Sequence, residues 1–144
     1  MRNFSNEVAI TLGKAFTSGS ATGIVESPVI DMAQYEGVIA VCRFGTTSTA
    51  NGLQALMGTA SASAGLSEVL DSYSTGDSSV TWLEIYRPKQ RFVQFQAVRE
   101  AATKLDGMYI FQYGARSEPV TNSTKSVING KLLISPDTGQ STST

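Results

Sequence analysis

The fold is decided by residues 38–44, which read Val-Ile-Ala-Val-Cys-Arg-Phe. In an extended chain successive side chains point to opposite faces, and here both faces are largely apolar. Such a run is typical of a central strand that is packed on both sides. Residues 79–86, 91–98 and 108–113 are also rich in β-branched and aromatic side chains, which favour strands. We therefore expect a mainly β protein.

Turn-forming residues separate these runs. Pro88 ends the strand over 79–86, because proline has no N–H to donate to a ladder. Asp106-Gly107 predicts a turn before residues 108–113, and Asn129-Gly130 predicts a hairpin over 126–134. Apolar side chains share a helical face over 97–105, but a helix this short is marginal. At most one short helix is expected.

The 144 residues fit a single domain, and no break in composition marks a second one. Residues 17–23 are small and polar, which predicts a hinge that lets the preceding residues reach a neighbouring subunit. We therefore interpret residues 1–23 as an extended N-terminal arm and residues 24–136 as the domain body. Residues 137–144 are rich in hydroxyl side chains and are expected to form a flexible tail.

The composition argues against most classes of enzyme. The chain has no histidine, the commonest general base, and its single cysteine, Cys42, rules out an internal disulfide or a Cys-based zinc cluster. No glycine-rich phosphate motif is present. Two carboxylate pairs, Asp31 with Glu36 and Glu84 with Glu100, are interpreted as solvated or hydrogen-bonded groups. We expect no enzyme activity and no catalytic, cofactor-binding or metal-binding residues.

Charge is unevenly distributed although the net charge is only −1. Residues 44–86 contain four acidic and no basic side chains, whereas residues 87–104 contain five basic and one acidic. Two interpretations remain open: each stretch faces a partner of opposite charge, or the two face and neutralise each other. Phe92 and Phe95 lie among the basic residues, but alternation sends them to opposite faces, and we interpret them as core residues rather than base-stacking groups.

We expect neither a nucleic-acid partner nor a membrane partner. The longest uninterrupted apolar stretch is residues 38–42, far short of the roughly 20 residues that a membrane-spanning helix needs.

Three segments read Ser-Pro-Val-Ile-Asp-Met-Ala-Gln-Tyr-Glu-Gly-Val over 27–38, Tyr-Arg-Pro-Lys-Gln-Arg-Phe-Val over 86–93 and Ile-Phe-Gln-Tyr-Gly-Ala-Arg over 110–116. Together they resemble a family of small virion proteins encoded beside the head genes of tailed bacteriophages. The resemblance implies an antiparallel β-sandwich or jelly-roll-like body and a capsid cement or decoration protein. It also implies a homotrimer that is made in the cytoplasm of a bacterial host and binds the major capsid protein on the capsid exterior.

Two groups of residues are candidates for that contact. Arg87, Lys89 and Arg91 lie near a strand end and suit an acidic capsid surface, whereas Tyr35 and Glu36 lie in a stretch without simple core alternation. For all five, exposure to solvent without any partner remains the alternative.

Two other functions remain open. One is a tail, neck or head-completion component of the same kind of particle. The other is a carbohydrate-binding β-sandwich domain whose stacking residues would be Trp82, Tyr73 and Tyr86.

Overall fold

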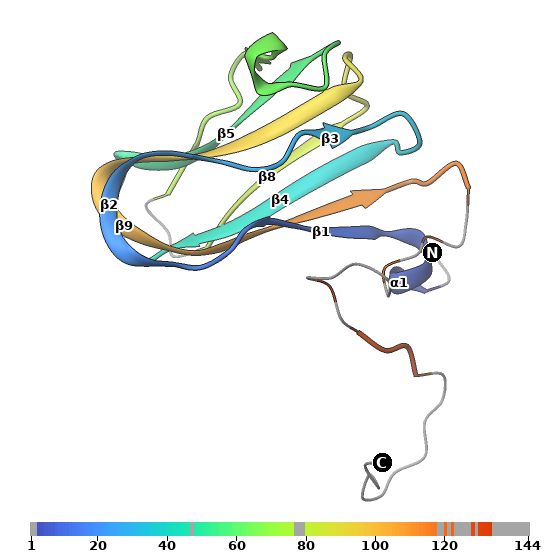
Figure 1. Cartoon of the computed structure of the whole chain (residues 1–144), viewed down its shortest axis with the longest axis horizontal. Coiled ribbons are helices and arrows are strands. Elements are labelled where there is room, and N and C mark those ends of the chain that lie inside the picture. The colour runs from blue at the N-terminus through green and yellow to red at the C-terminus, as the bar shows by residue number, and fades with distance from the viewer. Residues whose placement is uncertain are drawn as a thin grey trace, which may run out of the picture.

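The computed structural model describes residues 3–46, 48–76, 80–117, 120, 122, 128 and 130–133. Among these residues, nine strands form one antiparallel sheet. Helical structure is limited there to α1 (Phe4–Glu7) and the 3-10 turn η1 (Ser63–Gly65). The expectation of a mainly β fold with one short α-helix is confirmed (Figure 1).

The 22-residue strand β9 (Phe92–Tyr113) runs through the centre of the sheet. Its first half pairs with β5, β2 and β3, which span Asn51–Gly58, Thr17–Glu26 and Ile30–Asp31. Its second half pairs with β4 and β1, which span Gly37–Phe44 and Ala9–Lys14. The short strands β6 (Ser67–Glu68) and β7 (Ser74–Thr75) extend the sheet beside β5, and β8 (Val80–Tyr86) extends it beside β4.

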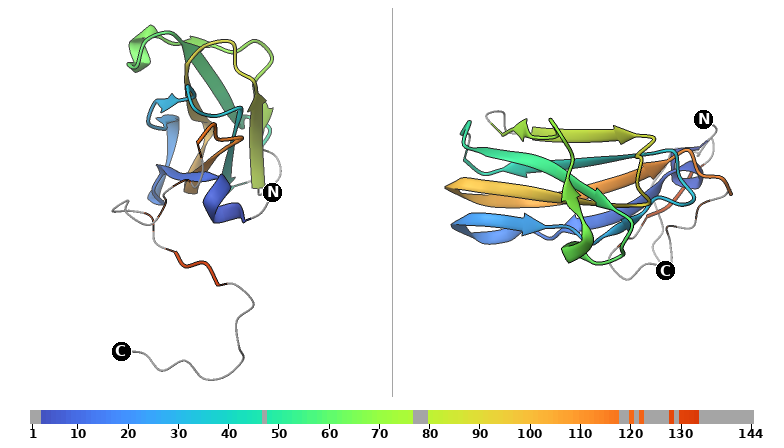
Figure 2. Two further views of the ribbon diagram at one scale, coloured as in Figure 1. Left: turned by 90° about the vertical axis from the view of Figure 1, so that its right-hand side faces the viewer. Right: turned by 90° about the horizontal axis from the view of Figure 1, so that it is seen from above.

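The sheet curls, so that its two halves face each other in a β-sandwich-like body (Figures 1 and 2). The pairing of β9 with β1, β2 and β4 is interrupted by register shifts. All of these shifts lie opposite the middle of β9, around residues 99–108. Such irregularities bend a strand and increase its local twist. We call the two parts the β5 half (β5, the first half of β9, β2 and β3) and the β4 half (β8, β4, the second half of β9 and β1).

The hydrophobic core lies between these halves. The β5 half contributes Leu53 and Phe95, the β4 half contributes Val38 and Ile110, and all four side chains are fully buried. Cys42 is part of the same cluster and carries a free thiol, as expected for a lone cysteine. Burial raises the pKa of this thiol to about 12.

One local prediction about the 97–107 region is wrong, and the marginal helix considered over 97–105 does not form. Residues 97–105 are strand rather than helix, and Asp106-Gly107 lies inside β9 rather than in a turn between two strands. Gly107 does adopt a positive φ of 106°, but within the bend of the strand. The physical reason is that backbone partners on other strands flank this segment and favour its extended form over the local preference.

The predicted N-terminal arm, residues 1–23, supplies β1 and much of β2 to the sheet of its own chain. Ile10 pairs with Phe111, and the Leu105 N–H donates a 2.9 Å hydrogen bond to Thr17 Oγ1. The predicted tail over 137–144 lies outside the described residues, as does Asn129 of the predicted hairpin turn. Among the residues described, no helix has the length and apolar character to cross a lipid bilayer.

Candidate functional site

Three connections meet at one end of the molecule. They are the link from β3 to β4 (residues 32–36), the link from β8 to β9 (residues 87–91) and the chain just after β9. Backbone N–H groups tie them together: Met32 donates to Arg91 O at 2.8 Å, Arg87 to Glu36 O at 2.7 Å and Arg116 to Gln34 O at 2.8 Å. Segments distant in sequence are therefore held in one fixed arrangement.

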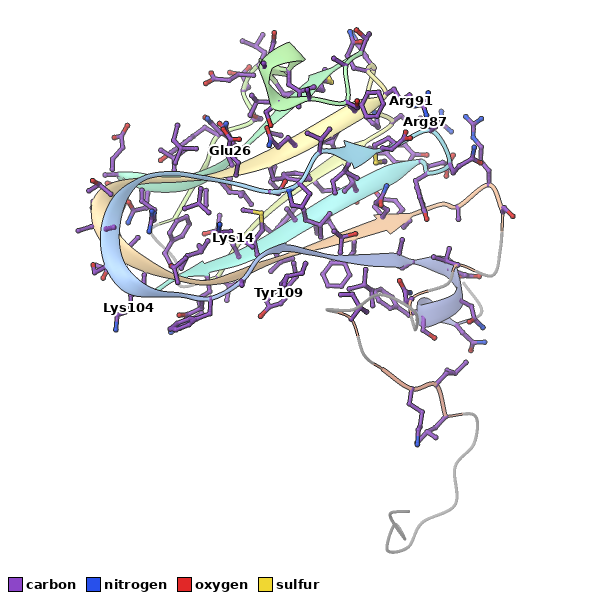
Figure 3. All side chains as sticks on the ribbon, in the orientation of Figure 1. Lys14, Glu26, Arg87, Arg91, Lys104 and Tyr109 are labelled. Atoms are coloured by element: carbon purple, nitrogen blue, oxygen red, sulfur yellow. The ribbon has the colours of Figure 1, made fainter. Side chains whose placement is uncertain are left out.

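These connections enclose an open hollow of about 550 Å³, which we call the basic hollow. Figure 3 shows Arg87 and Arg91 side by side at this end. The two groups of predicted contact residues, which sequence analysis treated separately, line the same surface. The lining residues are Met32, Ala33, Tyr35, Glu36, Arg87, Pro88, Lys89, Gln90, Arg91 and Arg116.

Arg91 is oriented by a bidentate pair with Asp31. Its Nε donates to Asp31 Oδ1 at 2.9 Å and its Nη2 donates to Oδ2 at 2.8 Å. The Ala33 N–H also donates to Oδ1, at 3.0 Å. The hydrogen bonds from Arg91 and then from Ala33 lower the pKa of Asp31 below its ordinary value, because they stabilise the carboxylate. Asp31 therefore serves as an anion that holds Arg91 in place.

Arg87 is held more loosely. Its backbone has a positive φ of 53°, which reverses the chain between β8 and Pro88. Its Nη2 lies 3.5 Å from Glu36 Oε1, and its guanidinium carbon lies 5.1 Å from the centre of the Tyr86 ring. An exposed ion pair of this length is strongly screened by water, so Arg87 remains available to an outside anion.

Lys89 and Arg116 have no acidic group within 4 Å among the described residues. The hollow thus carries four cationic side chains, and Asp31 and Glu36 are the carboxylates paired with them. This surplus of positive charge suits an anionic surface on a partner, where exposed charges set orientation and association rate.

Gly114 shapes the same hollow. Its φ is +67°, and a Cβ at this position would lie 2.7 Å from the Glu36 Cβ. Glycine therefore lets the chain turn tightly after β9 and bring Arg116 over the hollow. Arg116 was not among the predicted contact residues, although it lies in the 110–116 segment that resembles the virion family.

The candidate carboxylate pairs do not act as pairs. Asp31 and Glu36 each face their own arginine, and Glu84 accepts a hydrogen bond from the Tyr113 hydroxyl. Burial and this hydrogen bond raise the pKa of Tyr113. Across the described ranges, no cluster of three or more Asp, Glu, Cys or His side chains is placed to hold a metal ion.

The ion pairs bear on the two interpretations of the charge pattern. They join Arg43 to Asp106, Arg87 to Glu36 and Arg91 to Asp31 in the part of the chain that the structure describes. None of them connects the acidic side chains of residues 44–86 with the basic side chains of residues 87–104. Direct neutralisation of one stretch by the other therefore has no support from these pairs.

The three aromatic residues considered for sugar stacking do not form one platform. Trp82 and Tyr86 lie on the exposed side of β8. Tyr73 instead lies over Gly52 of β5, and its hydroxyl donates a 3.2 Å hydrogen bond to Ala50 O.

No protein-family model and no curated protein matches this chain. Among solved structures, one described as the crystal structure of PirA aligns with 78% of this chain and 98% of its own, at 12% identity and a TM-score of 0.39. A likeness this weak has no bearing on function.

Proposed function

We propose that this chain is a structural protein of a bacteriophage virion that binds the outer capsid surface and stabilises the shell by bridging capsomers. Its partner is the major capsid protein, and the basic hollow makes the contact. It acts as a cement or decoration protein, assembled as a homotrimer, and performs no catalytic step.

One observation carries the proposal. The segments 27–38, 86–93 and 110–116, which resemble the virion family, are far apart in sequence, and parts of all three line the basic hollow. The resemblance therefore includes the loops of one surface in addition to core strands. That distribution favours a shared binding surface over a likeness of fold alone.

The chemistry of the hollow explains how such binding would work. Lys89 and Arg116 have no acidic partner among the described residues and Arg87 is weakly paired, so an acidic capsid surface would find three available cations. Exposed charge pairs are individually weak. A multimer that touches two capsomers gains strength because the second contact forms within an existing complex, at high effective concentration.

Co-sedimentation with purified shells tests this proposal. The shells are those of the phage that encodes this chain under the proposal, and the protein is added until binding saturates. We expect saturable binding that weakens as salt is added, since the contact is electrostatic. Protein that remains in the supernatant at all concentrations in low salt would exclude the proposal.

Copy number separates the shell from the other virion locations. A cement protein should be present in purified particles at a copy number comparable to that of the major capsid protein. A tail, neck or head-completion component should instead be present at the much lower copy number of a single ring, which quantitative gel staining distinguishes.

A further inference from the structure

The outer side of the β4 half carries a continuous apolar surface. Residues that pair directly across an antiparallel sheet point to the same side. The register places one row of four such residues across β8, β4, β9 and β1: Trp82, Val41, Tyr109 and Leu12. The adjacent row consists of Glu84, Ile39, Phe111 and Ile10. We call these two rows, with Val80 and Tyr86 at the ends of β8, the apolar face.

Much of this face is open to solvent. Trp82 is 59% exposed, Tyr86 57%, Val80 53% and Tyr109 47%. Figure 3 shows Tyr109 projecting from the lower side of the β9 ribbon. At one end, Phe4 of α1 packs edge-on against Phe111 with 5.9 Å between ring centres, and a hollow of about 470 Å³ lies beside them.

The other outer side of the molecule is different. On the β5 half, Gln54 Nε2 donates to Gln96 Oε1 at 2.8 Å, and Gln96 Nε2 donates to Glu26 Oε1 at 3.1 Å. These side chains are polar and bonded to one another, although Gln96 is only 7% exposed. An antiparallel sheet normally presents polar side chains to water and directs apolar ones to the core. The β4 half departs from that pattern, so its exposed side is suited to a partner.

The size of the face fits contact with another protein surface. A whole aromatic side chain has a surface of roughly 150–250 Å². Each half-exposed aromatic side chain of the apolar face therefore exposes on the order of 100 Å². With the aliphatic side chains between them, the face exposes on the order of 600 Å². That is at the upper end for a monomer's largest apolar patch, about 300–600 Å². It also supplies most of the roughly 800 Å² that each partner contributes to a standard interface.

We propose that the apolar face is covered by another copy of this chain. Most soluble oligomers consist of identical chains in a closed symmetric arrangement, and the area that this face exposes is close to what such a contact needs. Two charged groups of this region have partners within the chain. Glu84, at the β8 end of its row, accepts a hydrogen bond from the Tyr113 hydroxyl, and Arg43, which pairs with Val80 across the sheet, forms an ion pair with Asp106. Arg43 therefore keeps its charge partner and Glu84 keeps its hydrogen-bond donor when water is excluded from the face, which reduces the cost of association.

This inference goes beyond the proposed function and does not depend on it. In a two-fold or three-fold assembly, the row containing Trp82, Val41 and Tyr109 lies at the subunit interface. The experiment below uses the protein without shells, so its outcome is independent of the result for shell binding.

Native mass and tryptophan fluorescence test the inference together. Trp82 is the only tryptophan, so its emission reports on this face alone. We expect the full chain to have a native mass of at least twice the 15.3 kDa of one chain, and its emission to move to shorter wavelength as subunits associate.

Val41→Lys places a charge in the middle of the face and should give a monomer with long-wavelength emission and an unchanged far-ultraviolet circular dichroism spectrum. Tyr109→Glu is a second variant at a more exposed position, in case Val41→Lys does not fold. Leu70→Lys is the matched control, because Leu70 is 89% exposed and lies outside the apolar face. It should associate as the wild type does.

Two results would overturn the inference. One is a wild-type protein that stays monomeric at all concentrations. If added oligosaccharides then change the Trp82 emission of that monomer, the face is assigned to a sugar ligand instead. The other is an oligomer whose mass neither Val41→Lys nor Tyr109→Glu alters, which would place the subunit contact elsewhere.

Discussion

The guanidinium of Arg91 and the carboxylate of Asp31, 60 residues apart, are joined by two hydrogen bonds of 2.9 and 2.8 Å. This pair links the end of β3 to the residue just before β9. Both side chains are exposed, so its main effect is geometric. It fixes the position of one of the four cations in the basic hollow.

The first prediction concerns Asp31 and pH. The pKa of Asp31 is lowered in the folded protein, so its pairing stabilises the fold above the ordinary value of 3.8. That stabilisation is lost as the pH falls through the lowered pKa. Asp31→Asn should therefore be less stable than wild type at neutral pH, and the difference should vanish in acid. Urea midpoints measured at stepped pH values check this, and a difference that persists at the lowest pH would contradict it.

The second prediction concerns Lys89 and Arg116, the two cations of the basic hollow without an acidic partner among the described residues. Lys89→Glu and Arg116→Glu should each weaken shell binding, by roughly tenfold or about 1.4 kcal/mol. Added salt should shrink the effect, because the contact is electrostatic. Lys104→Glu is the matched control: this lysine is exposed at the opposite end of the molecule (Figure 3). Binding isotherms on purified shells measure all three, and equal losses in the control would argue against the basic hollow as the contact.

The third prediction concerns Gly114. An alanine there would need an unfavourable positive φ and would bring its Cβ against Glu36. Gly114→Ala should lower the free energy of unfolding by about 1–3 kcal/mol. Gly19→Ala serves as the control, since no atom lies within 4 Å of a Cβ built at Gly19. Thermal unfolding compares the two variants, and similar melting temperatures would show that the turn at Gly114 tolerates a side chain.

The fourth prediction uses Cys42 as a reporter of the core. Cys42 is 2% exposed and the pKa of its thiol is raised to about 12, so little thiolate forms at neutral pH. A thiol reagent should label the folded protein very slowly and should label one site per chain in denaturant. Mass spectrometry over time measures both rates. Rapid labelling without denaturant would show that the two halves of the sheet do not close over Cys42.

The strands with the strongest β patterns were predictable from sequence. Residues 38–44 and 79–86 correspond closely to β4 and β8, because their side chains favour an extended chain wherever it is placed. Residues 99–107 were not predictable as strand, since their extended form depends on backbone partners in β2 and β4. Local turn preference at Asp106-Gly107 is weaker than that long-range pairing.

The candidate site was predictable only in pieces. Basic residues near a strand end pointed to Arg87, Lys89 and Arg91, but their proximity to Tyr35 and Glu36 depends on how the loops are tied together. The apolar face depends on strand register, which fixes the side to which each row points. Alternation along β8 places Trp82 and Tyr86 together, whereas sequence alone does not bring Tyr109 beside them.

A protein that stabilises a capsid shell must raise the temperature at which the shell ruptures. Shells lacking the protein are heated alone, with saturating wild type and with saturating Lys89→Glu. We predict that wild type raises the rupture temperature and that Lys89→Glu raises it less at the same concentration. An unchanged rupture temperature at saturating wild-type protein would contradict the claim.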